Sequence, residues 1–578
     1  MVPKTLDTDI LILGSGGAGL FAALHAHQAQ LRAASPLSIT VAVKGLLGKC
    51  GCTRMVQGGY NVALAREDSV ERHFMDTIEG GKWLPDQDLA WQLVTLAVER
   101  IRELENELGC FFDRNPDGTV HQKAFAGQTF DRTVHKGDLT GIEIINRLAE
   151  QVWARKIARL EEHRAVELIR SSSGDSLAGV LFIDMRTGEY VFVRAKAVLL
   201  GTGGGPTMYK YHTPSGDKSC DGLAMALRAG LPLRDMEMVQ FHPTGLLAGM
   251  HTRMTGTVLE EGLRGAGGYL LNGSKERFMQ HYDPKAERAT RDVVSRGMYS
   301  EMVRGNTSPH GGLYISMAHL GPERVRRDFK GMVERCADCG FDLAGGLVEV
   351  VPTAHYMMGG VEFGGDCSTA LPGLFVAGED AGGVHGANRL GGNGVANSTV
   401  FGAVAGDTMA QWVRDQDFRE ADRASIDAAI EACELPFRSG GKAQLHPLRD
   451  KLQDVMWDKV GIIRDAAGLA EAERDLAALD AELERCSLPD ANRAFNLTWH
   501  DWLNLRSLVA VSRVIAAAAI ARTDSRGAHF RADFPDTGSL EGSCFTSLTR
   551  ESKGLEIRMK PVHFTRVRPG ESLLKNAA

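Results

Sequence analysis

The stretch DTDILILGSGGAGLFAALHAH, residues 7–27, joins an apolar run to an alanine-rich segment through a cluster of glycines. The run at 10–13 is typical of a buried strand, and the alanine-rich segment suits a helix. Gly14, Gly16 and Gly19 fit the pattern GxGxxG: the first turns tightly, the second lets backbone approach a pyrophosphate, and the third lets helix and strand pack closely. The stretch predicts a Rossmann-like dinucleotide site with phosphates at the helix N-terminus.

Later parts of the chain extend this prediction. The next apolar run, LSITVAVKG, ends near Lys44, where an NAD-binding fold usually has an acidic residue for the ribose, and this argues against an ordinary NAD site. The strand-to-glycine pattern returns in AVLLGTGGGP, which ends at Pro206, and in PGLFVAGEDAGGVHGANRLGGNG at 372–394. We therefore expect one nucleotide-binding domain built from segments far apart in the chain.

The regions around these glycine turns differ in character. Between the second and third turns, residues 244–354 are dense in His and Arg, which indicates an inserted domain that carries substrate chemistry. From about 420 onward, apolar residues recur at helical spacing with charged faces, as in GLAEAERDLAALDAELERC, and the tail after Pro535 is less regular. The apolar stretch LVAVSRVIAAAAIAR is interrupted by Arg513 and is shorter than the ~20 residues that a membrane span needs, so it predicts a buried helix.

Charge and cysteine content exclude several classes of protein. The 578 residues include 66 Lys and Arg against 73 Asp and Glu, a net charge of -7, with no basic run for nucleic acid or an anionic membrane. The N-terminus shows neither a cleavable apolar leader nor a twin-arginine pair, so we expect a cytoplasmic protein. Ten cysteines are too few for a disulfide scaffold in a chain of this length.

Motifs along nearly the whole chain show a resemblance to one protein family. The chain resembles the flavoprotein subunit of the succinate dehydrogenase and fumarate reductase family, which also includes L-aspartate oxidase. The motifs that carry the resemblance appear in family order: LGSGGAGL at 13–20, VQGGYN at 56–61, DTIEGGKWLPDQD at 76–88, DGLAMALRAGLPLRDMEMVQFHPTG at 221–245, EEGLRGAGGYLLN at 260–272, RDVVSRGM at 291–298, PTAHYMMGG at 352–360, HGANRLGGNG at 385–394 and SRGAHFRADFP at 525–535.

The resemblance implies an α/β fold with FAD as cofactor. A Rossmann-like FAD-binding domain would be interrupted by an α+β capping domain and followed by a C-terminal helical domain. The expected boundaries are 1–243 and 355–418 for the FAD-binding domain, 244–354 for the capping domain, 419–535 for the helical domain and 536–578 for a tail region. At family positions for flavin contact the chain has Gly14, Ser15, Gly16, Gly17, Ala18, Gly19, Lys44, Cys52, Thr53, Gly58, Gly59, Asp221, Glu379, Gly394 and Val395.

The inserted segment supplies groups for redox chemistry beside a carboxylate. Moving a hydride to or from that carbon requires cations that hold the carboxylate and a group that moves a proton. By resemblance, His242, His355 and Arg389 bind substrate carboxylates, Arg291 is the proton shuttle, and Glu261 belongs to the relay that resupplies it. Taken singly, a histidine is more often a core or surface residue, and an arginine such as Arg291 often caps a helix or pairs with a neighbouring Asp. Phe125 matches an aromatic residue that packs on substrate, with a core role equally open.

Cys52 marks a departure from the family. Where many members have Ser-His-Thr and bond the flavin through the histidine, this chain reads Gly51-Cys52-Thr53, so a histidyl link is impossible there. We expect non-covalent FAD, and a cysteinyl link through Cys52 stays open. The pair Cys50 and Cys52 lacks the four ligands of a zinc or iron-sulfur site, as does the lone CxxC at 336–339, so we expect no metal.

Glu260 is a second departure. Fumarate and succinate enzymes have Thr-Glu-Gly here, whereas this chain reads Glu260-Glu261-Gly262. An ionised glutamate only accepts hydrogen bonds, so it would repel a second substrate carboxylate unless it is protonated or turned away. A substrate with an amine, hydroxyl or amide at that point would fit better.

These observations support one main hypothesis with two alternatives. The main one is an FAD-dependent oxidoreductase that interconverts a saturated, succinate-like carboxylate, with or without an amino or hydroxy substituent, and its α,β-unsaturated product. The alternatives are an L-aspartate oxidase-type enzyme and a catalytically silent electron-transfer subunit. Since the chain has no ferredoxin-like cysteine run, we expect a separate iron-sulfur subunit as partner, and at most indirect membrane contact.

Overall fold

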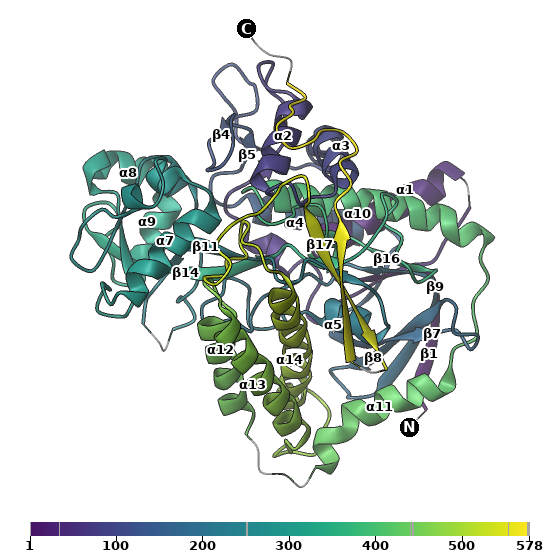
Figure 1. The fold of residues 1–578 in the computed structure, drawn as a ribbon. Helices are drawn as coiled ribbons and strands as arrows, with labels where there is room; N and C mark the ends of the chain where they lie inside the picture. The colour runs from purple at the N-terminus through teal and green to yellow at the C-terminus, as the bar shows by residue number, and fades with distance from the viewer. Residues whose placement is uncertain are drawn as a thin grey trace.

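A seven-stranded sheet forms the centre of the molecule. The computed structural model describes residues 2–33, 35–249, 252–439, 441, 444–552 and 554–574. The strands run in the order β6-β2-β1-β9-β8-β7, and β16 also pairs with β9 (Figure 1). Their bounds are β1 Lys4–Leu13, β2 Ile39–Ala42, β6 Ala158–Leu160, β7 His163–Arg170, β8 Leu177–Asp184, β9 Tyr190–Leu200 and β16 Leu374–Val376.

The strands that precede the three glycine turns are parallel neighbours in this sheet. Leu13 of β1 lies opposite Leu200 of β9, and Leu200 lies opposite Val376 of β16. The three turns therefore leave the sheet side by side, although their strands are far apart in the chain. The prediction of one nucleotide-binding domain assembled from distant segments is confirmed.

Two helices pack closely on this sheet. Helix α1, Gly17–Ala33, follows the first glycine turn, and α10, Asn393–Trp412, follows the third. A Cβ at Gly402 of α10 would lie 2.6 Å from the Ala18 carbonyl oxygen, so only glycine allows this approach. Further elements beside them are α2 Val70–Gly80, α3 Gln87–Asn106, α4 Thr140–Trp153 and a small sheet of β3 Tyr60–Asn61, β4 Gln122–Lys123 and β5 Thr133–Val134.

The segment between the second and third glycine turns has a sheet and a core of its own. Its strands run in the order β11-β14-β13-β12, with bounds β11 Val239–Leu246, β12 Tyr269–Leu271, β13 Leu313–Ser316 and β14 Leu347–Met357. The helices α6 Gly262–Gly265, α7 Arg291–Val303, α8 Pro322–Asp328 and α9 Lys330–Ala337 pack with it (Figure 1, left). The segment is mixed α and β, as expected for a capping domain, and its exact boundaries stay a prediction.

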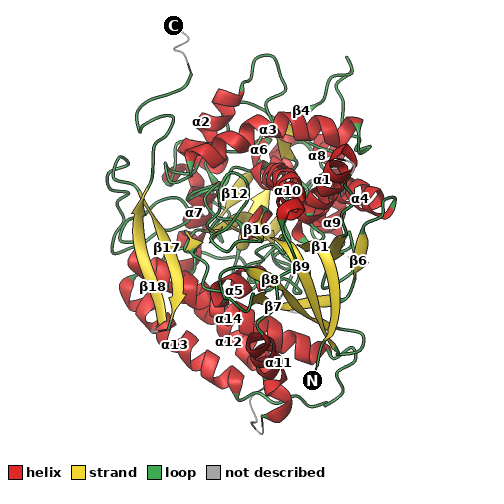
Figure 2. Cartoon of the chain, turned by 90° about the vertical axis from the view of Figure 1, so that its right-hand side faces the viewer, coloured by secondary structure: helices red, strands yellow, loops and turns green. Residues whose placement is uncertain are grey.

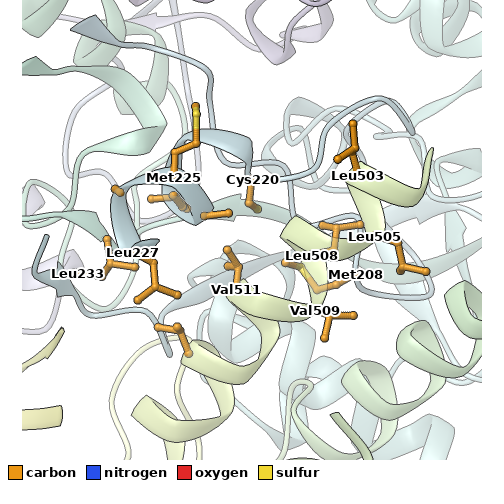
Figure 3. Close-up of a cluster of buried hydrophobic side chains, with 14 of the residues drawn as sticks. Met208, Cys220, Met225, Leu227, Leu233, Leu503, Leu505, Leu508, Val509 and Val511 are labelled. Carbon is orange, nitrogen blue, oxygen red and sulfur yellow. The ribbon is translucent and has the colours of Figure 1, made fainter. Parts of the chain in front are cut away.

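Four helices follow the sheet domain, which confirms the expected helical domain: α11 Arg423–Arg438, α12 Leu445–Lys459, α13 Ala466–Glu484 and α14 Leu497–Ala521. Helix α14 has 25 residues and contains an 18-residue window with a mean hydropathy of 1.5, so by length and composition it could cross a membrane, but 72% of that window is buried inside the protein. It is longer than its apolar stretch because Trp499 and Trp502 extend the buried face. Its Leu508 and Val511 lie near Met225 and Leu227 of α5, Asp221–Arg228 (Figure 3).

The C-terminal tail is more regular than its sequence suggests. Strands β17, Cys544–Glu551, and β18, Gly554–Pro561, form an antiparallel hairpin (Figure 2). Strand β17 also pairs with β10, Leu233–Arg234, which in turn pairs with β15, Gly360–Val361. The strands carry many polar and charged residues on exposed positions, which hides the hairpin from a search for apolar runs.

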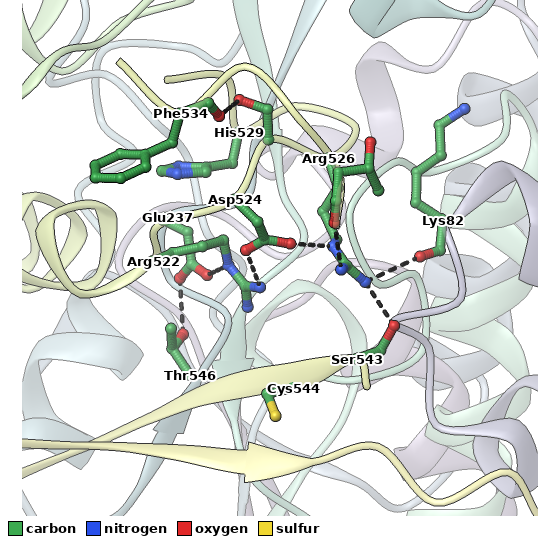
Figure 4. A network of polar contacts seen from close by, with 12 residues as sticks. Lys82, Glu237, Arg522, Asp524, Arg526, His529, Phe534, Ser543, Cys544 and Thr546 are labelled. Atoms are coloured by element: carbon green, nitrogen blue, oxygen red, sulfur yellow. Dashed lines mark hydrogen bonds and ion pairs between the residues drawn. The ribbon is translucent and has the colours of Figure 1, made fainter. Parts of the chain in front are cut away.

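A buried ionic network joins the end of α14 to this hairpin and to the segment before β11. Arg522 donates to Glu237 at 2.5 Å and lies 3.4 Å from Asp235, and all three side chains are at most 1% exposed. Glu237 also accepts a hydrogen bond from Thr546 of β17, and Asp524 bridges Arg522 to Arg526 (Figure 4). The network therefore fixes three distant segments to one another.

We expect Arg522→Met to lower the thermal stability of the protein strongly, because it leaves the charge of Glu237 buried without its ion-pair partner, whereas Asp235 keeps Arg234. Removing one partner of such a pair typically costs about 3–5 kcal/mol. Arg513→Met is the matched control, since Arg513 pairs with Asp480 at the surface, where ion pairs contribute about 0–1 kcal/mol. Thermal unfolding of both variants tests this, and equal melting temperatures would contradict it.

Candidate active site

One cavity of about 550 Å³ contains nearly all of the predicted site residues. It lies where the glycine turns after β1, β9 and β16 meet the inserted segment, and it is lined by Gly14, Gly201 and Gly378 on one side and by His242 and Arg291 on another. Of the site residues named from the sequence, only Gly19 does not line it, because Gly19 packs beneath the turn: a Cβ there would lie 2.0 Å from the Gly14 carbonyl oxygen.

The first glycine turn forms a cradle for a phosphate-bearing group. Gly14 has φ +106, and a Cβ there would lie 2.2 Å from the Gly201 carbonyl oxygen. At Gly16, by contrast, the nearest atom to an added Cβ is the Thr53 hydroxyl oxygen at 3.4 Å, so this backbone faces open space. The Gly17 amide, at the start of α1, donates to Thr53. This open backbone at a helix N-terminus fits the pyrophosphate of a dinucleotide.

A buried charge cluster lies beside Lys44. Its ammonium donates to Asp221 Oδ2 at 2.8 Å, and Arg164 donates to Asp221 Oδ1 at 2.8 Å. Burial acts to raise the pKa of Asp221, but Arg164 and Lys44 outweigh it and hold the pKa well below its usual range. At the strand end where an NAD-binding fold usually has an acidic residue, this protein has Lys44, and the carboxylate beside it comes from Asp221 of α5. Arg164 was missed from the sequence because no local pattern links it to Asp221.

Cys52 lines the cavity as a neutral thiol. Burial, with a contribution from the charge of Glu379, raises its pKa to about 12. Cys50 lies 3.8 Å from the Ser15 hydroxyl and donates to a carbonyl oxygen. All ten cysteines are free thiols, and among the described residues no group of three or more His, Cys, Asp or Glu side chains is arranged to hold a metal.

Arg291 and Glu261 form a buried ion pair in the cavity. Arg291, the first residue of α7, donates to Glu261 Oε2 through Nη2 at 2.6 Å and Nε at 3.1 Å. Arg264 donates to the other carboxylate oxygen at 3.1 Å, and Gln240 accepts from Arg291 Nη1 at 3.0 Å. Burial acts to raise the pKa of Glu261, but the two arginines outweigh it and lower the pKa. Arg264 was missed from the sequence, although its i,i+3 spacing from Glu261 is visible there.

His242, His355 and Arg389 lie around the same space. The two imidazole rings are 5.5 Å apart, and His355 Nδ1 is 2.8 Å from the Thr213 hydroxyl. Burial first, and then the charge of Arg291, lower the pKa of both histidines well below the usual value, so they are neutral. Burial and Arg291 also lower the pKa of Arg389 to about 10. Its Nε has no hydrogen-bond partner among the described residues.

Phe125 and Glu260 form another wall. Phe125 is 7% exposed, and its ring lies against Gly58, where a Cβ would be 2.4 Å from the ring. Gly59 has φ +147 and packs against a β5 carbonyl, so both glycines are required by packing in addition to lining the cavity. Glu260 is buried and accepts from Lys123 at 3.1 Å, a partner that sequence reasoning missed.

Comparisons with known proteins agree on one family. An FAD binding domain matches residues 9–395, and the C-terminal region of the fumarate reductase flavoprotein matches residues 449–573. An uncharacterised FAD-dependent oxidoreductase of Methanocaldococcus jannaschii is 39% identical over 92% of this chain and 94% of its own length. One subunit of the CoM/CoB fumarate reductase of Methanothermobacter marburgensis is 38% identical over 93% and 96%. The flavoprotein of E. coli quinol fumarate reductase superimposes with a TM-score of 0.91 at 31% identity, covering 98% of this chain and 99% of that one.

The fold and site define an FAD-dependent oxidoreductase. The chain belongs to the fumarate reductase and succinate dehydrogenase flavoprotein family, and FAD is its cofactor. The sequence-based predictions of family, fold class and cofactor are confirmed.

Gly16→Ala should lower the FAD content of the purified protein strongly without unfolding it, because the added methyl group points into the phosphate cradle and meets only Thr53. Gly14→Ala should instead lower the yield of folded protein, because its methyl group meets the Gly201 backbone. Flavin absorbance per protein, together with the melting temperature, separates the two effects. A Gly16→Ala protein with full FAD content would rule out this place for the pyrophosphate.

FAD should leave the protein on acid precipitation. The Cys52 thiol, with a pKa of about 12, is almost entirely protonated at neutral pH and is a poor nucleophile for bonding the flavin ring. The measurement is the yellow colour of the supernatant, with Cys52→Ser as control. Flavin that stays in the native pellet but not in the Cys52→Ser pellet would establish the cysteinyl link instead.

Proposed function

We propose that this protein interconverts a saturated carboxylate and its α,β-unsaturated product, with Arg291 as the proton shuttle. The observation that carries the proposal is the Arg291–Glu261 pair, buried in the same cavity as His242, His355 and Arg389. In this cavity an anionic substrate would lie beside the positive charge of Arg389. The proton-transfer group, Arg291, would lie beside the flavin site. Bound FAD supplies the hydride, or accepts it in the opposite direction.

Each residue has a distinct task in this proposal. Arg389 pairs with a substrate carboxylate and stabilises the negative charge that spreads onto it during the reaction. His242 and His355 are neutral, so they serve as hydrogen-bond donors to the same group. Arg291 gives or takes the proton at the carbon next to the one that exchanges the hydride, and Glu261 and Gln240 hold its guanidinium in place for this step.

The proton of Arg291 is resupplied through its neighbours. Glu261 accepts from Arg291 with one carboxylate oxygen and from Arg264 with the other, so the three side chains form a continuous chain of hydrogen bonds. Arg264 also donates to the Glu287 carbonyl oxygen at 2.8 Å, which fixes its guanidinium against Glu261. Glu261 is therefore placed to pass a proton to Arg291 from Arg264.

The remaining features extend the proposal. FAD binds without a covalent bond, through the glycine cradle, Thr53, Asp221, Glu379, Gly394 and Val395, and the capping domain spans about 244–354. The electrons of bound FAD would pass to or from a separate iron-sulfur subunit. We place the enzyme in the cytoplasm. The relative that is named as one subunit of a fumarate reductase supports a multi-subunit enzyme.

An L-aspartate oxidase-type reaction is the second candidate. The observation that favours it is Glu260, whose carboxylate replaces the family threonine and suits a substrate with a donor group. Oxygen-dependent imine formation from L-aspartate by the isolated chain would support this candidate. A catalytically silent subunit is disfavoured, because burying Arg291, Arg389 and Arg264 together is costly without an anion to bind.

Arg291→Ala should reduce turnover by about 10²–10⁴-fold, the usual contribution of a positioned proton-transfer group, while FAD content stays near that of the native protein. The assay is anaerobic recovery of oxidised-flavin absorbance after reduced enzyme meets an enoate such as fumarate or its monoamide. Arg304→Ala is the matched control, because Arg304 follows the last residue of the same helix, its side chain is 67% exposed, and it lies outside the cavity. An equal loss of turnover in both variants would indicate a general disturbance of α7 and would contradict the role of Arg291 as proton shuttle.

A further inference from the structure

We propose that Gln57 and Glu260 form an acceptor site, which selects substrates that carry N–H donors, as in a carboxamide, at the end away from the carboxylate bound near Arg389. This inference rests on the proposed function and adds the substrate class. We call Gln57 and Glu260 the acceptor site.

Glu260 presents one free carboxylate oxygen to the cavity. Its Oε2 accepts from Lys123 Nζ at 3.1 Å, whereas Oε1 accepts no hydrogen bond within the part of the chain that the structure describes. The side chain is 6% exposed and lines the cavity. The charged groups that face it are Lys123, Asp138 and Arg335, which differ from the arginines around Glu261.

Gln57 carries a second acceptor without a donor, and its side chain is among those that line the cavity. Its amide nitrogen donates to the Val258 carbonyl at 3.1 Å, which fixes the orientation of the amide, and its Oε1 is buried with no hydrogen-bond partner among the described residues. Gln57 is 9% exposed and also lines the cavity. Because Val258 is two residues before Glu260, this hydrogen bond ties Gln57 to the segment that carries Glu260.

The two free oxygens select a donor and reject an anion. A buried acceptor without a donor is costly, so the site gains from a ligand that supplies hydrogen atoms to both. A primary carboxamide has two N–H donors, whereas a carboxylate has none. Lys123 already balances the charge of Glu260, so a neutral carboxamide fits better than an ammonium group, which would add an unpaired charge.

Three small enoates of similar shape test the inference: fumaramate with a terminal amide, fumarate with a terminal carboxylate, and crotonate with a methyl group. We expect fumaramate to exceed both others by about 10-fold or more in kcat/KM, in the anaerobic reoxidation assay on the FAD-loaded protein. Flavin difference spectra give the dissociation constants of the same compounds without turnover. A native protein that prefers fumarate in both measurements would overturn the inference.

Glu260→Thr restores a hydroxyl donor and should reverse the preference in favour of fumarate, while Gln57→Leu should reduce the advantage of fumaramate. Glu334→Thr, at an exposed position of the same inserted segment, is the control and should leave the ratio unchanged. An unchanged ratio in Glu260→Thr would overturn the acceptor site. If none of the three compounds reoxidises the flavin, the proposed function fails, and the ratio of dissociation constants still decides the acceptor site.

Discussion

The close contact between the turns after β1 and β9 is the constraint on which the rest of the structure depends. The backbone of Gly14 comes so near the Gly201 carbonyl that no side chain fits between them. This contact keeps the two turns open toward the same cavity, and the pairing of β9 with β16 adds the third turn. The inserted segment begins and ends on the paired strands β11 and β14, which contribute His242 and His355 to the same cavity.

Uneven distribution of buried charge governs the chemistry of the cavity. Arg291 and Arg389 line it, and Glu261 is the lining carboxylate that pairs with Arg291 and with the buried Arg264. Burial first, and then this positive charge, lower the pKa of His242 and His355 and keep them neutral, and the same charge makes an anionic ligand favourable. Lys123 and Glu260 form a separate ion pair, so the charges around Glu260 differ from those around Glu261.

Local chemistry explains what could be predicted from the sequence. The glycine turns and the helical periodicity depend on neighbouring residues, and together with the family motifs they predicted the fold class. The family motifs also predicted that Arg291 and Glu261 act together. Pairings across long sequence separations could not be found in this way, as with Asp221 and Arg164 or Glu260 and Lys123. The same limit hid the β17–β18 hairpin, because its stability depends on pairing with β10, more than 300 residues earlier.

The order of the strands in the sheet has a consequence for how the protein is made. The first strand, β1, pairs with β9 about 190 residues later, and the adjoining strand β16 emerges only after the whole inserted segment has been synthesised. Contacts of such long range form slowly and leave apolar strand edges exposed meanwhile. The N-terminal half of a growing chain therefore keeps an incomplete sheet on the ribosome until the last turn of the cradle has been translated.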